Sequence, residues 1–155
     1  MVTAQQMMRI GVISDTHDLL RDSAKRALQG VEHILHVGDV CSPSILEELR
    51  EIGPLTTVCG NMDRFMDLPF VEAVELGGCW IFMLHDLEHL DIDPAGRFQV
   101  VLHGHTHRPE ILEKDGVLYF NPGSAGPRRG NLPVSLGYLD ILDAKAEARW
   151  VKIEE

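Results

Sequence analysis

Three short apolar runs are each followed within two residues by a polar residue, and the spacing of these pairs constrains the fold. The runs occupy residues 9–14, 31–38 and 55–59, and the polar residues that follow are Asp15, Asp39 and Asn61. Intervals of 24 and 22 residues separate the three polar residues, which leaves room for the crossover of a dozen or more residues that parallel strands need. We therefore predict a parallel sheet with right-handed crossovers. The three polar groups should lie at the carboxyl ends of neighbouring strands, where α/β sheets bind ligands.

The connecting segments and the second half of the chain extend this prediction. Residues 20–29 contain helix formers before Gly30, and Ser42 followed by Pro43 predicts a capped helix that continues to Ile52. Three later pairs of strand-like runs predict hairpins, at 71–76 with 79–85, 111–114 with 117–121, and 135–142 with 146–153, the last through a three-residue turn at 143–145. We expect an α/β fold in one domain, residues 1–155, with two packed mixed sheets and a few outer helices.

Composition excludes several classes of function. The chain has 24 acidic and 14 basic side chains and a net charge of −10, so we expect no long duplex nucleic acid as a partner. It has no charged start followed by an apolar stretch and no run of 18 apolar residues, and we therefore expect a cytoplasmic protein without a membrane partner. Its three cysteines show no CxxC spacing, which argues against a disulfide framework and a thiolate zinc site.

Seven oxygen or imidazole donors follow successive predicted strands. They are Asp15, His17, Asp39, Asn61, His85, His105 and His107. Any one of these motifs alone has a simple structural explanation as a turn or a capped loop. Together they would bury two carboxylates and four imidazoles without a counter-charge, which is heavily destabilising. A bound metal resolves this conflict, and the number of donors favours two metals that share a carboxylate.

The order of these motifs carries a family resemblance. The series Asp15-x-His17, Gly38-Asp39, Gly60-Asn61-x-Asp63, His85 and Gly104-His105-x-His107 resembles that of the calcineurin-like metallophosphoesterases. The chain length and the segment 121–124, with Pro127-Arg128 after it, resemble the small prokaryotic phosphodiesterases of that superfamily. The resemblance implies a four-layer α/β/β/α sandwich of two mixed sheets with flanking helices.

The resemblance also implies a binuclear metal centre and a role for each donor. It assigns Asp15, His17, Asp39 and His107 to one metal, and Asp39, Asn61, His85 and His105 to the other, with Asp39 as the bridge. The activity implied is hydrolysis of a small phosphate ester, above all a phosphodiester, by a hydroxide that bridges the metals. Asp39 and Asn61 are then the catalytic residues, and Asn61 and Arg128 contact the substrate. Manganese is the first expectation for the metal, with nickel, iron, zinc or magnesium as alternatives, and a homo-oligomer is left open.

Met62 departs from the pattern of the wider superfamily. Many members have a histidine at this position, which is read as the acid that protonates the leaving group. Asp63, His89 and His103 stay open as substitutes, although we expect Asp63 to orient a metal-ligating histidine through a hydrogen bond.

Two further features keep a rival function open. Asp86 follows His85 where the superfamily usually has glycine, and the segment at 86–102 is short, so we expect a peripheral helix to be missing. This could open the site or weaken the second metal. The rival is a metal-stabilised interaction scaffold, resembling the retromer subunit of the same fold, with little or no turnover. Retention of all seven donors favours the enzyme.

Overall fold

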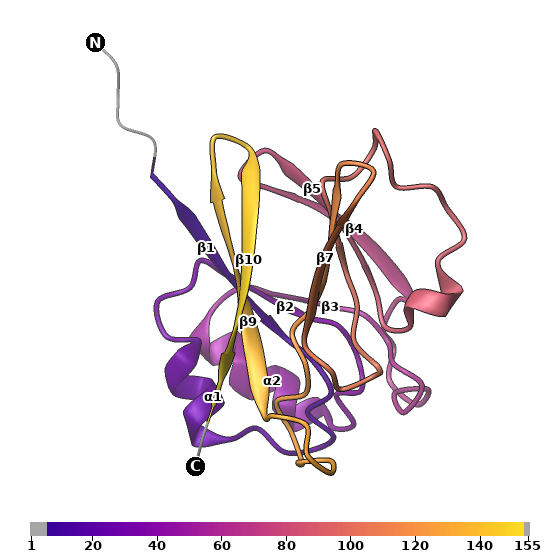
Figure 1. Ribbon diagram of the computed structural model, residues 1–155. Helices are drawn as coiled ribbons and strands as arrows, with labels where there is room; N and C mark the ends of the chain where they lie inside the picture. Colours follow the sequence, from indigo (N-terminus) through magenta and orange to yellow (C-terminus); the bar gives the residue numbers. More distant parts are fainter. Residues whose placement is uncertain (1–5, 154–155) are drawn as a thin grey trace.

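Two five-stranded sheets pack face to face in the computed structural model, which describes residues 6–153 (Figure 1). The first sheet, in the order β10-β9-β1-β2-β3, contains β1 (Met8–Ile13), β2 (His33–His36), β3 (Leu55–Thr57), β9 (Ser135–Leu142) and β10 (Lys145–Lys152). The second, in the order β4-β5-β6-β8-β7, contains β4 (Val71–Leu76), β5 (Cys79–Leu84), β6 (Val100–Leu102), β7 (Glu110–Lys114) and β8 (Val117–Asn121). Strands β1, β2 and β3 run parallel, as do β5, β6 and β8. The predicted pair of mixed sheets is confirmed.

Alternate side chains of the central strands fill the space between the sheets. Ile10 and Val12 of β1 and Ile81 and Met83 of β5 belong to one buried apolar cluster. Side chains two residues apart in a strand share a face of the sheet, so the intervening residues must be covered from outside. Phe120 of β8 is the bulkiest of the fully buried side chains and belongs to the same cluster. This core fixes the two sheets relative to each other.

The outer face of the first sheet is covered by α1 (Asp22–Ala27) and α2 (Pro43–Ile52), as Figure 1 shows. Helix α2 begins as predicted, because the Ser42 hydroxyl accepts a hydrogen bond from the Ser44 N–H and proline occupies the first turn. Its Leu49 is fully buried in one apolar cluster with Ile34 of β2. Neither helix of the described residues has the length and apolar character to span a bilayer.

The outer face of the second sheet has a thinner cover. The described chain forms no α-helix between β5 and β6, only the 3-10 turn η1 (Leu87–His89) in an irregular segment. Leu87, Leu90 and Phe98 of this segment pack against a small cluster on the sheet that includes Phe82 and Val101. The fold class agrees with the expected sandwich, and its fourth layer is reduced to this segment, as the short sequence there predicts.

The last hairpin corrects one detail of the prediction. The turn between β9 and β10 has two residues, Asp143 and Ala144, both with positive φ (53° and 60°), and Lys145 already pairs with Leu142. Two residues with positive φ suit the right-handed twist of paired strands, which explains why the shorter turn is adopted. The predicted three-residue turn was therefore wrong by one residue.

Candidate metal centre

The predicted donors lie where the carboxyl ends of the parallel strands of both sheets meet. From the first sheet come Asp15 and His17 after β1, Asp39 after β2 and Asn61 after β3, and from the second come His85 after β5 and His105 and His107 after β6. The structure brings six of them together in two adjoining groups. Asp15, His17 and His107 form the first (the Asp15 cluster), and Asp39, His85 and Asn61 form the second (the Asp39 cluster). Asp15 is close to both groups, because its Oδ1 also lies 3.8 Å from His85 Nε2. The two clusters are in contact, because His17 Nε2 lies 3.5 Å from Asp39 Oδ2.

The Asp15 cluster surrounds a carboxylate oxygen that lacks a donor. Asp15 is fully buried, and its Oδ2 accepts hydrogen bonds from Ser14 Oγ at 2.6 Å and from the His105 backbone N–H at 3.1 Å. Its Oδ1 has no hydrogen-bond partner among the described residues and lies 3.4 Å from His107 Nε2 and 3.6 Å from His17 Nε2. A buried carboxylate oxygen without a partner is costly. A cation between these three side chains would satisfy it.

In the Asp39 cluster, the proton position on His85 can be assigned from its neighbours. His85 Nδ1 lies 2.8 Å from the Val37 carbonyl oxygen, which only accepts hydrogen bonds, so Nδ1 carries the proton. Nε2 lies 3.3 Å from Asp39 Oδ2, so it donates to that carboxylate when His85 is protonated and offers a lone pair to a cation when His85 is neutral. A backbone carbonyl that fixes the tautomer in this way is typical of metal-binding histidines.

Asn61 completes the Asp39 cluster with a side-chain amide. In the orientation that satisfies its neighbours, the amide nitrogen donates to His85 Nε2 at 3.1 Å and to the Asp39 carboxylate at 3.2 Å. Turning the amide over would present its oxygen to a cation at this point instead. Oxygen and imidazole ligands without a thiolate suit manganese, iron, zinc, nickel or magnesium, so the donor set fits a divalent metal.

Ionisation of the two carboxylates follows from their imidazole neighbours. Burial alone would raise the pKa of Asp15, but His107 and His17 outweigh it and hold this pKa well below its usual range. Burial likewise acts to raise the pKa of Asp39, yet His85 and the Met62 N–H lower it. Both side chains are therefore carboxylates at neutral pH, as a cation site requires.

Most of the predicted donors have a left-handed backbone. Positive φ values occur at Asp15 (54°), His17 (45°), Asp39 (59°), His105 (72°) and His107 (64°). Such conformations cost non-glycine residues about 1–3 kcal/mol each and cluster at functional sites. Backbone hydrogen bonds across the rim hold them, since the Asp15 N–H donates to the Gly38 carbonyl and the His17 N–H to that of Asp39.

Two glycines of the motifs leave space for the carboxylates. A Cβ atom at Gly60 would overlap the Asp39 carboxylate. One at Gly104 would overlap Ser14 Oγ and come within 2.8 Å of Asp15 Oδ2. The glycines of the Gly-Asn and Gly-His pairs therefore serve close packing against the donors of neighbouring strands.

His105 lies outside both clusters. Its side chain is 43% exposed, and its Nε2 lies 3.7 Å from Asp86 Oδ2. The Asp86 carboxylate thereby gives His105 a partner that a glycine at that position would not supply. The role of His105 as a metal ligand stays a prediction.

The three candidates for the leaving-group acid have different surroundings. Asp63 is fully buried, and its carboxylate accepts the backbone N–H groups of Val40, Cys41 and Gly60 at 2.8 to 3.1 Å. The expected hydrogen bond from a histidine to the Asp63 carboxylate was therefore wrong, because backbone N–H groups are the donors to this carboxylate. His103 is buried as well, whereas the His89 side chain is 80% exposed.

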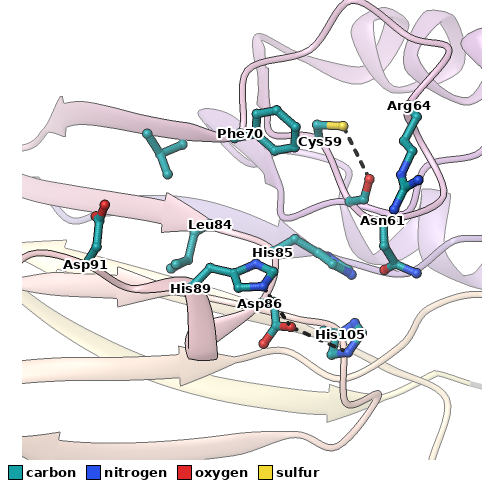
Figure 2. Close-up of a pocket in the computed structure, with 12 residues that line it drawn as sticks. Cys59, Asn61, Arg64, Phe70, Leu84, His85, Asp86, His89, Asp91 and His105 are labelled. Carbon is teal, nitrogen blue, oxygen red and sulfur yellow. Dashed lines mark hydrogen bonds and ion pairs between the residues drawn. The ribbon is translucent and has the colours of Figure 1, made fainter.

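A cavity of about 410 Å³ opens beside the Asp39 cluster (Figure 2). Asn61, His85 and His105 line it together with two residues that sequence reasoning missed, Arg64 and Phe70. Both belong to the loop after β3, and their nearness to the Gly-Asn motif was the available signal. Arg128 is exposed and does not line this cavity, so its contact with substrate stays a prediction.

The predicted turn at 121–124 supports the rim. Asn121 is fully buried, and its amide donates to the Gly104 carbonyl at 3.0 Å and to Thr106 Oγ1 at 3.1 Å. Its Oδ1 accepts the Gly123 N–H at 2.9 Å. Asn121 thereby fixes the loop that carries His105 and His107.

Because two histidines are buried in their neutral form, we predict that the free energy of unfolding decreases in acid. Burial lowers the pKa of His36 and of His103 to about 4, so the unfolded chain takes up these protons near pH 6.5 and the folded chain only near pH 4. Their contribution to the free energy of unfolding is complete above pH 6.5 and declines as the pH falls, by about 2 kcal/mol per histidine at pH 5. Urea unfolding in chelator at pH 7.5 and 5.0 measures this decline. His103→Gln should show a smaller decline than the wild type, and an equal decline would contradict the assignment.

Comparisons with known proteins agree with the geometry. The model of the calcineurin-like phosphoesterase superfamily domain matches residues 8–144. A probable metallophosphoesterase of Methanothermobacter thermautotrophicus is 35% identical over 136 residues, covering 76% of this chain and 77% of that protein. A phosphodiesterase of Methanocaldococcus jannaschii is 28% identical over 172 residues, covering 95% and 100%. The crystal structure of Vps29 from Chaetomium thermophilum matches with a TM-score of 0.76 at 21% identity, over 94% of this chain and 95% of that chain, which is a likeness of fold.

Proposed function

The chain belongs to the calcineurin-like phosphoesterase superfamily, and from this premise we propose that it hydrolyses a small phosphodiester at a centre that holds two divalent metal ions. The observation that carries the proposal is the buried carboxylate oxygen at the centre of the Asp15 cluster. Asp15 Oδ1 has no hydrogen-bond donor among the described residues and lies 3.4 Å from His107 Nε2 and 3.6 Å from His17 Nε2. The similarity to a phosphodiesterase over 95% of the chain supports the choice of a diester.

In this proposal two metals share Asp39. Asp15, His17, Asp39 and His107 hold one ion, and Asp39, Asn61, His85 and His105 hold the other. When bound, two such ions supply an activated hydroxide and neutralise the charge that develops on the phosphoryl oxygens. Because the asparagine is neutral, the site keeps a positive excess that suits an anionic diester. Manganese is the metal we propose first.

The chain's own residues position this chemistry. Val37 and Ser14 orient His85 and Asp15 through hydrogen bonds of 2.8 and 2.6 Å. The Met62 N–H donates to Asp39 Oδ1 at 2.9 Å, which leaves Oδ2 directed at His17 and His85. These contacts hold the donors in place before any substrate arrives, and this preorganisation favours catalysis.

Metal should stabilise the folded protein. A ligand at 100 times its Kd adds about 2.7 kcal/mol to the free energy of unfolding, which corresponds to a rise in Tm of roughly 5 to 10 °C for a domain of this size. Thermal unfolding with excess manganese and with excess chelator, after verified removal of metal, measures the difference. Identical melting curves would contradict a preformed metal site.

A measurement of turnover distinguishes the proposed enzyme from an interaction scaffold. The metal-loaded protein should hydrolyse an activated aryl phosphodiester, and chelation should abolish the rate. If the protein binds metal but is inert with manganese, nickel, iron, zinc and magnesium, the enzymatic proposal fails and the scaffold reading takes its place.

A further inference from the structure

The cavity beside the Asp39 cluster is larger than a phosphate group requires. Its volume of about 410 Å³ lies in the range of small-molecule sites. The Asp39 cluster forms only one part of the wall, and the remainder extends along the loop after β3 and the start of β4. An organic group attached to the phosphorus therefore has room beside the metal centre.

One side of the cavity is apolar and exposed. Phe70 is 77% exposed, Val71 is 48% exposed, and both line the cavity with the buried Leu84. The backbone just before Phe70 is fixed, because the Pro69 carbonyl accepts the Cys59 N–H at 2.7 Å. Phe70 is thus an aromatic ring on an anchored backbone, left open to solvent within a cavity. Such a ring can stack on a planar group of a ligand.

The end of the cavity near Asn61 carries a positively charged side chain, that of Arg64. Arg64 is the only lysine or arginine among the lining residues, and its guanidinium has no hydrogen bond or ion pair with the rest of the described chain. Figure 2 shows Arg64 and Asn61 toward one end of the view and Asp91 toward the other, with Phe70 and Leu84 between them. A guanidinium binds phosphate oxygens through a fork of N–H donors. An unpaired arginine next to the metal donors is therefore suited to a phosphate.

A carboxylate at the far end of the cavity complements N–H groups. Asp91 lines the cavity away from the Arg64 end, and its carboxylate can only accept hydrogen bonds when ionised. Nucleobases carry amino and imino N–H donors on the edge of a planar ring. The succession of cation, aromatic ring and carboxylate thus matches the succession of phosphate, ring face and ring edge in a nucleoside phosphate.

We propose that the cavity takes a nucleoside phosphodiester as substrate, with Arg64 on a phosphate oxygen and Phe70 stacked against the base. This inference rests on the proposed hydrolysis of a diester, and it adds that one organic group of the diester is a nucleoside. Phe70 is then a specificity-determining residue, and Arg64 a residue that binds the phosphate of every diester. Long duplex DNA does not fit, because its bases are stacked inside the helix.

Two substrates with the same leaving group test the proposal. Thymidine 5′-(p-nitrophenyl) phosphate and methyl p-nitrophenyl phosphate both release p-nitrophenolate, so a difference in kcat/KM reports the thymidine. We expect the wild type with manganese to prefer the thymidine ester about 10-fold or more, since stacking on an aromatic side chain has an effect of that size. Phe70→Ala should bring the ratio of the two kcat/KM values close to 1, and Phe70→Trp should preserve it.

A matched control is Phe65→Ala, because Phe65 is also strongly exposed, at 69%, but does not line the cavity. This variant should keep the wild-type ratio. Arg64→Ala should lower kcat/KM for both esters and leave their ratio unchanged. Equal kcat/KM values for the two esters in the wild type, or an equal loss of the ratio in Phe65→Ala, would overturn the inference while the proposed hydrolysis stands.

A binding measurement covers the case in which neither ester is hydrolysed. The proposed function then fails, and the affinity of the manganese-loaded protein for thymidine 5′-phosphate decides the inference by itself. Weaker binding by Phe70→Ala than by Phe65→Ala supports a nucleotide site. Equal affinity of the two variants, or no binding by the wild type, overturns it.

Discussion

Replacing Asp39 by asparagine should lower the hydrolysis of an aryl phosphodiester by about 10³-fold or more, since several kcal/mol of charge stabilisation depend on the shared carboxylate. Asp39 contacts a histidine of each cluster, with Oδ2 3.5 Å from His17 Nε2 and 3.3 Å from His85 Nε2. Asparagine has nearly the same shape but no charge. The expected result is a folded protein that has lost turnover, measured as kcat/KM with added manganese.

The control for this variant is Asp22→Asn, an exposed carboxylate in the first turn of α1. It should keep the wild-type rate, since it removes the same charge away from the rim. Near wild-type turnover of Asp39→Asn would show that the carboxylate is not shared by two catalytic metals. Circular dichroism and a melting curve establish that both variants are folded.

Removal of the Asp63 carboxylate should cost about 3 to 4 kcal/mol in the free energy of unfolding, because each buried donor left without a partner costs about 1 kcal/mol or more. Asp63→Ala leaves the N–H groups of Val40, Cys41 and Gly60 without their acceptor. Urea unfolding of the metal-free protein measures the loss. Asp63→Asn should lose less, since an amide oxygen still accepts hydrogen bonds.

Asp67→Ala is the matched control for Asp63→Ala. Asp67 lies in the same loop but is exposed. Its removal should change the free energy of unfolding by no more than about 0.5 kcal/mol. Equal stabilities of the two alanine variants would mean that the hydrogen bonds to Asp63 do not stabilise the loop.

Strand spacing was sufficient to predict the parallel strands of the first sheet and the edge at which they end, and turn residues predicted the later hairpins. Asp15, Asp39 and Asn61 lie at the ends of β1, β2 and β3 because the crossover length forces the polar residue after each strand to the same edge. The start of α2 could also be predicted, because the residues that determine it, Ser42 and Pro43, act on the adjacent backbone of the same helix. Family membership and the two-sheet fold are confirmed, whereas the roles of individual donors stay predictions.

Features that depend on contacts between distant segments could not be predicted in this way. The role of Asp63 depends on N–H groups that the fold brings from the loop after β2, 22 and 23 residues away. Arg64 and Phe70 gain their significance only because the loop after β3 lies beside His85 of the other sheet. The contact of His105 with Asp86 likewise joins the ends of two strands that are separated in sequence.

The origin of the donors in both sheets has a mechanical consequence. Asp15 and Asp39 are attached to β1 and β2, whereas His85 and His107 are attached to β5 and β6. Any ion held by both sets would act as a cross-link at one end of the sandwich, as a disulfide does between distant parts of a chain. Away from this rim the sheets are joined mainly by apolar side chains, whose contacts have no preferred direction. A loaded centre would therefore make the rim resist shear between the sheets, and the opposite end would be the first to separate.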